Sequence, residues 1–144
     1  MTTRGRWSVL ALALTVAGLT ACSNGCASAN GGLYVGVRAA KTVVQTLQHG
    51  EEKLVCGRPD APPAPACVTL ELHHTIHAYI EEAAEYGQQV SLIMADVPKG
   101  DPTPGQALDL ALKIKALVQK VLDSLPKSPQ ADALAAEVRA AGKE

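Results

Sequence analysis

A set of apolar side chains in the middle of the chain repeats at intervals of four and three residues, a spacing typical of a long amphipathic helix. The set is Leu72, Ile76, Tyr79, Ala83, Tyr86, Val90, Ile93 and Val97. Such a heptad pattern is typical of helices that pack knobs into holes. It predicts a helix over residues 67–97, which the Pro- and Gly-rich residues 98–105 would end. Its seam is expected to form the protein's own core, and the alternative is a helical face that docks a protein partner.

Two segments on either side of this helix also show helical spacing. Residues 33–55 place apolar side chains on one face, although Gly50 weakens the last third because glycine costs about 1 kcal/mol against alanine inside a helix. The apolar positions of this segment are Leu33, Val37, Ala40, Val44 and Leu47. Residues 103–125 are expected to begin with Thr103 as N-cap and Pro104 at the first helical position. Their apolar stripe is Leu110, Ile114, Leu117 and Val121, widened by Leu108, Ala111, Val118, Leu122 and Leu125.

A short fourth helix is expected over residues 129–141, after Ser128, with Leu134 and Val138 facing inward. Short connections between amphipathic helices favour antiparallel neighbours. The expected fold class is therefore all-α: a small antiparallel helical bundle of three long helices plus a short C-terminal helix, occupying residues 33–144. No segment shows the two-residue alternation of a strand, so no sheet is expected.

The composition argues against some functions. The chain has 13 basic and 14 acidic residues, and removal of the first 21 residues with Arg4 and Arg6 would change the net charge from −1 to −3. An acidic chain lacks the electrostatic footprint of nucleic-acid binding, so no nucleic-acid partner is expected. The sequence also lacks a G-x-S-x-G motif, a P-loop and a dinucleotide fingerprint, and we expect neither an enzyme nor a cofactor.

The N-terminus follows the pattern of an export signal. Arg4 and Arg6 form a positive region, and residues 7–20 form an apolar run that is too short for a comfortable membrane span of about 20 residues. The sequence Leu19-Thr20-Ala21-Cys22 follows directly. It resembles the lipobox of bacterial lipoproteins.

This resemblance implies that residues 1–21 are a signal peptide and that Cys22 receives a diacylglyceryl group. Residues 22–32 would then be a lipidated flexible tether, since they are small, polar and Gly-rich. The expected location is the cell envelope, with the membrane as partner through the lipid. Ser23 after the cysteine implies the periplasmic face of the outer membrane rather than the inner membrane. The alternatives are a soluble secreted protein and an uncleaved membrane anchor.

The other cysteines predict one disulfide bond. Cys56 and Cys67 bracket a Pro-rich connector between two expected helices, and disulfides persist in exported proteins. A Cys56–Cys67 bridge would contribute about 3 kcal/mol in the chain-entropy model. A metal or redox pair is disfavoured because the two cysteines lack C-x-x-C spacing. Cys26 is left as a free thiol, an intermolecular disulfide or a second acylation point.

A histidine cluster is the one candidate ligand site. His73 and His77 lie one helical turn apart, and Glu81 follows one turn later, so the three side chains could share a zinc, copper or nickel ion. His49 lies in the preceding expected helix, near the same end of the hairpin, and could approach this cluster. Solvated histidines beside the core are the competing interpretation. The expected function is a structural or protein-interaction role at the cell envelope, and the alternative is a periplasmic metal or small-ligand binding protein.

Overall fold

The computed structural model describes Leu33 and residues 35–144. This part of the chain forms four α-helices: α1 (Ala40–Leu54), α2 (Leu70–Ala95), α3 (Gly105–Ser124) and α4 (Pro129–Ala141). The described residues contain no strand, and an isolated bridge pairs Val55 with Val68. The all-α prediction is confirmed. The predicted signal peptide (1–21) and tether (22–32), with Cys22 and Cys26, lie outside the described residues.

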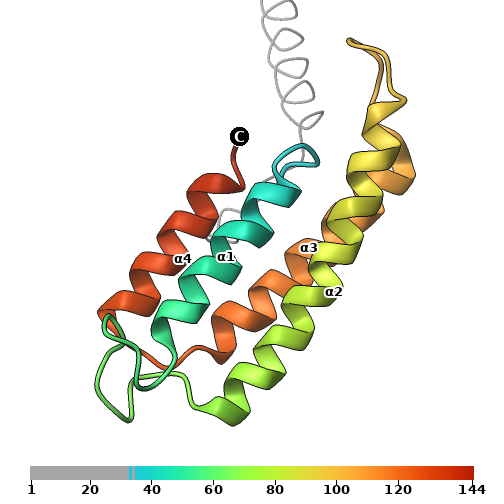
Figure 1. The fold of residues 1–144 in the computed structure, drawn as a ribbon. Helices are drawn as coiled ribbons and strands as arrows, with labels where there is room; N and C mark the ends of the chain where they lie inside the picture. Colours follow the sequence, from blue (N-terminus) through green and yellow to red (C-terminus); the bar gives the residue numbers. More distant parts are fainter. Residues whose placement is uncertain (1–32, 34) are drawn as a thin grey trace, which may run out of the picture. The chain divides into compact units, whose positions relative to one another are not determined.

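The helices of the unit Leu33–Glu144 run antiparallel to their neighbours in sequence (Figure 1). α2 and α3 form a long hairpin, and α1 packs between this hairpin and α4. One apolar core joins all four helices. Its fully buried large side chains include Val43 and Leu47 of α1, Ile76 and Ile80 of α2, Ile114, Val118 and Val121 of α3, and Val138 of α4.

The helices differ in length, so one end of the hairpin extends beyond α1. α2 has 26 residues and α1 has 15, or about 39 Å and 22 Å at 1.5 Å per residue. Their connection holds the end of α1 level with the start of α2, because Val68 N donates to Leu54 O (2.8 Å) and Cys56 N donates to Val68 O (2.9 Å). The far end of α2 therefore reaches beyond the start of α1 (Figure 1). We call the connection of α2 to α3, residues 96–104, the hairpin tip.

α1 begins later than the sequence predicts. Leu33 is buried, as its spacing indicated, and Val35 is buried as well, but both residues precede the helix. Here Gly36 N donates to Gly142 O (2.9 Å), which ties the entering chain to the end of α4. Leu33 is therefore buried by tertiary packing, in a segment that is not helical.

The buried stripe of α2 is shifted from the predicted seam. Ile76, Ala83 and Val90 are buried as expected, but Ile80 and Gly87 replace Tyr79 and Tyr86. The tyrosines are half-buried at the edge of the core. α2 packs against both α1 and α3, so its buried stripe is centred between two neighbours instead of following one seam.

The start of α3 also differs from the prediction. Pro104 itself is the N-cap, with extended backbone (φ −58°, ψ 139°), and no side chain caps this helix end. Thr103 is therefore one residue too early to cap it. The predicted stripe of α3 is buried, but Leu108 is 47% exposed, whereas its neighbour Ala107 is fully buried.

α4 matches its predicted bounds, and its core positions Leu134 and Val138 are buried. The Ser128 hydroxyl accepts a hydrogen bond from Ala131 N (3.0 Å), which satisfies one free donor of the first turn. Gly50 of α1 allows α4 to pack closely. A Cβ built at position 50 would lie 2.0 Å from Leu134 Cδ1, so the glycine that weakens α1 locally provides the contact surface for α4.

Candidate functional site

The predicted disulfide is present at the end of the bundle where α1 connects to α2. Cys56 and Cys67 are bonded, with their Cα atoms 5.0 Å apart. The bond closes the loop that carries the Pro-rich connector, and Val68 beside it is fully buried. We call this region the disulfide end.

A buried carboxylate lies at the same end. Glu51 of α1 is only 1% exposed, and Nδ1 of His73 on α2 donates a hydrogen bond to its Oε1 (2.8 Å), with Oε2 at 3.1 Å. Glutamate is almost never fully buried unless it is paired. The contact therefore joins α1 to α2 through a polar pair inside the edge of the core.

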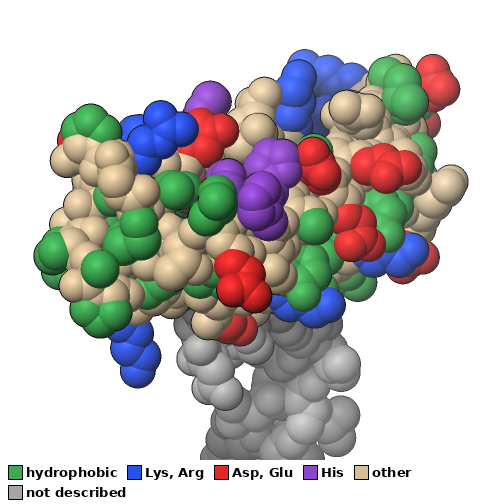
Figure 2. All heavy atoms as spheres, turned by 60° about the horizontal axis from the view of Figure 1, so that its bottom comes forward, with side chains coloured by type: hydrophobic (Ala, Val, Ile, Leu, Met, Phe, Trp, Pro, Cys, Tyr) green, Lys and Arg blue, Asp and Glu red, His purple; other side chains and the backbone are tan. Residues whose placement is uncertain are grey.

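His77, one turn further along α2, repeats this arrangement on the surface. Nδ1 of His77 lies 3.2 Å from Oε1 of Glu81, which is 70% exposed. The rings of His73 and His77 are edge to face, with centroids 5.8 Å apart. His74 is exposed beside His73. Figure 2 shows histidine side chains gathered on this face with acidic side chains next to them.

The three predicted metal ligands, His73, His77 and Glu81, are not arranged as expected. Glu81 contacts His77, while the carboxylate that contacts His73 is Glu51. His49 lines a separate hollow with Arg58 and Asp60. Within residues 33 and 35–144, no three His, Cys, Asp or Glu side chains are grouped closely enough to hold a metal ion. The three-ligand hypothesis gains no support from this geometry.

Sequence reasoning missed Glu51, although a signal was present. In α1 the buried positions Val44, Leu47, Glu51 and Leu54 follow each other at intervals of three and four residues. The carboxylate thus occupies a core position of the apolar stripe. A charged residue at such a position predicts a partner on the neighbouring helix, since an unpaired buried charge is very costly.

Two lysines of α3 lie against tyrosine rings of α2. Lys113 and Lys120 of α3 place their ammonium groups 5.4 Å and 5.5 Å from the ring centroids of Tyr86 and Tyr79 on α2. These cation–π contacts are worth about 0.5–1 kcal/mol each at exposed sites. The half-buried tyrosines therefore contribute to the pairing of α2 with α3.

Glu82 contacts Tyr86, one of these two tyrosines. The Tyr86 hydroxyl donates a hydrogen bond to Glu82 Oε1 (2.9 Å). This hydrogen bond and the negative charge of Glu82 raise the pKa of Tyr86 above its ordinary value of 10.0, with smaller contributions from desolvation and from Glu85.

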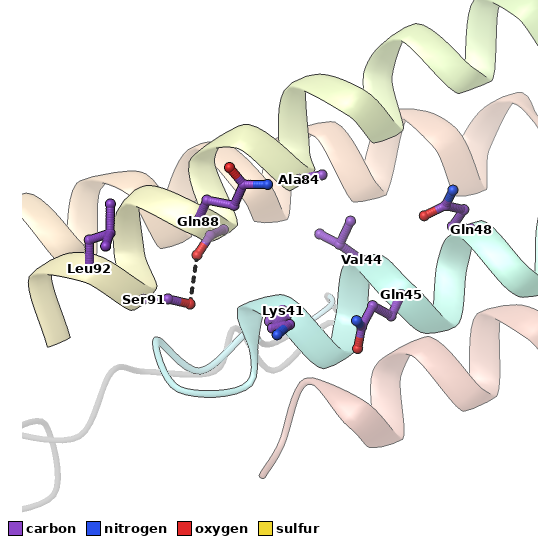
Figure 3. A pocket seen from close by; sticks show the side chains of 9 residues that line it. Lys41, Val44, Gln45, Gln48, Ala84, Gln88, Ser91 and Leu92 are labelled. Atoms are coloured by element: carbon purple, nitrogen blue, oxygen red, sulfur yellow. Dashed lines mark hydrogen bonds between the residues drawn. The ribbon is translucent and has the colours of Figure 1, made fainter. Parts of the chain in front are cut away.

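A groove of about 500 Å³ separates the first half of α1 from the second half of α2 (Figure 3). Its floor is apolar, and amide groups of Gln45, Gln48 and Gln88 lie along its sides. Lys41 and Leu92 lie at the end nearest the hairpin tip. The volume is within the range of small-molecule pockets. The hydroxyl of Ser91 is already used, because it donates to Gly87 O (3.0 Å).

No described helix has the length and apolar character needed to cross a membrane. Comparisons of the chain with protein-family models, with curated proteins and with solved structures found no match.

Proposed function

We propose that this protein is a lipid-anchored protein of the bacterial cell envelope whose helical bundle has a structural or protein-interaction role. The observation that carries the proposal is the sequence Leu19-Thr20-Ala21-Cys22 behind a positive region and an apolar run. Ser23 favours the periplasmic face of the outer membrane. A diacylglyceryl group supplies two chains, and stable anchoring requires at least two such signals.

The disulfide end supports export. Cys56 and Cys67 are bonded in the structure, and such bonds persist in oxidising compartments and are rare in the reducing cytosol. A bridged pair and an export signal are independent features of the chain, and both favour the same location.

The point at which the chain enters the bundle shows which end of the bundle the tether would join. Leu33 and Gly36 lie at the start of α1, and the disulfide end lies at the opposite end of that helix, about 22 Å away. A lipid-bearing tether over residues 22–32 would therefore hold the bundle by the end at which α1 starts. The hairpin tip lies at this same end of the described unit (Figure 1).

Exposed leucines support a role in contact with other envelope proteins. Leu92 of α2 is 71% exposed, and Leu108 and Leu112 of α3 are 47% and 63% exposed, one turn apart. Single exposed apolar side chains are ordinary. Together, Leu108 and Leu112 offer adjacent apolar side chains on α3 that a protein partner could cover.

The anchor is tested by a Cys22→Ser variant expressed in bacteria. We expect the parent to pellet with membranes and to carry an added mass of diacylglycerol at the mature N-terminus. The variant should lose that mass and move to the soluble fraction or keep its signal peptide. A Cys26→Ser variant is the matched control and should behave as the parent. If the parent carries no lipid, or if the Cys22→Ser variant pellets at an unchanged mature size, the proposal is wrong.

A further inference from the structure

His73 and His77, one turn apart on α2, each have Nδ1 against a carboxylate, and no described residue forms a hydrogen bond with Nε2 of either ring. Nδ1 of His73 donates to Glu51, and Nδ1 of His77 contacts Glu81. A carboxylate can only accept in such a bond, so the proton lies on Nδ1 when the imidazole is neutral. In both rings the lone pair is then on Nε2, the nitrogen that can bind a metal.

The same arrangement is the usual outer shell of a histidine metal ligand. Metal-binding imidazoles almost always donate their second nitrogen to a carboxylate or carbonyl, which fixes the ring and increases its basicity. Here the two rings lie one turn apart on one helix, with centroids 5.8 Å apart. His73 is 22% exposed and His77 is 38% exposed, so both rings can be reached from solvent.

We propose that His73 and His77 form a two-histidine site for a divalent transition metal, with Nε2 of each ring as ligand and water completing the coordination. Glu51 and Glu81 are positioning residues. In this site Glu81 orients His77 and is not a third metal ligand. Buried Glu51 orients His73 in the same way. The proposal goes beyond the anchoring role and does not depend on it.

The charges at the site suit a divalent cation. His73 is the fourth residue of α2, where the positive end of the helix dipole opposes a cation. The carboxylates of Glu51 and Glu81 offset this effect and balance the two charges of the ion. Imidazole ligands suit copper, nickel and zinc, and affinity follows the order in which Cu²⁺ exceeds both Ni²⁺ and Zn²⁺.

The site is tested by titration of the complete protein, purified in detergent without reductant, with CuCl₂, NiCl₂ and ZnCl₂. All samples carry Cys26→Ser, which removes a thiol that could bind these ions. We expect one equivalent of Cu²⁺ to bind with micromolar affinity and Zn²⁺ to bind more weakly. His73→Ala and His77→Ala should each weaken Cu²⁺ binding by at least about tenfold, whereas His74→Ala, the neighbouring control, should not change it.

A separate variant tests whether Glu81 positions His77. Glu81 is exposed, so Glu81→Gln should leave the helical circular dichroism unchanged and weaken binding by about tenfold, the lower range for outer-shell partners. Failure of Cu²⁺ to bind at micromolar concentration, or equal binding by a His73→Ala/His77→Ala double variant, would overturn the site. Unchanged affinity in Glu81→Gln would overturn the positioning role.

Discussion

The two ends of the bundle are built by different means. At the disulfide end, α1 and α2 are joined by a covalent bond, by the Val55–Val68 pairing and by the buried Glu51–His73 contact. At the hairpin tip, α2 and α3 extend past α1 and are joined by a Pro-rich turn (Figure 1). Gly100 in this turn has a positive φ of 100°.

This difference shows where the bundle's stability is concentrated. A region with many buried apolar contacts and cross-links opens only with much of the protein, whereas a region with few such contacts opens locally. We therefore expect amide hydrogens of the disulfide end to exchange more slowly than those near the hairpin tip. The following substitutions compare the two ends, from the largest expected effect to the smallest.

The largest difference is expected between Ile76→Ala and Leu92→Ala on the same helix. Ile76 is fully buried near the disulfide end, and its truncation should cost about 2–5 kcal/mol of unfolding free energy. Leu92 is 71% exposed, and its truncation should stay within about 0.5 kcal/mol. Urea unfolding followed by circular dichroism measures both. Equal losses would contradict the contrast between the ends.

Removal of the disulfide should have the next largest effect. A Cys56→Ser/Cys67→Ser variant should lose about 3 kcal/mol, because the open loop gives the unfolded chain more conformational freedom. The melting temperature with and without a reducing agent checks this value. Reduction should leave the melting temperature of the double variant unchanged, which serves as the control.

Gly50→Ala tests the packing of α4 against α1. The added Cβ would lie 2.0 Å from a buried leucine methyl group, so Leu134 must move within a packed core. We expect a loss of about 1–3 kcal/mol, despite the better helix propensity of alanine. Gly87→Ala is the matched control, since a Cβ at that position meets no atom within 4 Å. Stabilisation by Gly50→Ala would show that the close approach is not required.

The smallest effect concerns the titration of Tyr86. Its neutral form donates to Glu82, so this contact is fully present below pH 10 and is lost as the pH rises through the elevated pKa of Tyr86. Glu82→Gln removes the negative charge and should lower the pKa of Tyr86. Ultraviolet absorbance of the tyrosinate form measures the change. A tyrosine titration that is identical in parent and variant would contradict the contact.

The sequence predicted that four helices exist more accurately than it predicted the residues at which they start. α4 matched its bounds because Ser128 and Pro129 are strong local signals for a helix start. α1 and α3 started later than expected. For α1 the reason is tertiary, because Leu33 is buried in a segment that is tied to the end of α4, while α3 starts one residue later with Pro104 as its cap. Local periodicity contains no information about such tertiary contacts.

The disulfide could be predicted from the sequence, whereas the Glu51–His73 pair was not. Cys56 and Cys67 flank one short connector, so their proximity follows from the chain itself. The pair joins residues that are 22 positions apart on two helices. Its formation depends on the rotation of α1 against α2. The predicted seam placed Tyr79 and Tyr86 in the core, where the structure has Ile80 and Gly87. The sequence therefore predicted the wrong rotation of α2 about its own axis.

The hydrogen bond from Gly36 N to Gly142 O has a consequence for the topology of the folded unit. It brings the start and the end of the four-helix segment within 2.9 Å of each other, on the same side of the bundle. Chain ends that lie close together allow circular permutation. A short linker could therefore join residue 144 to residue 35, with new termini cut into the hairpin tip, and each helix would keep its neighbours in the rearranged order.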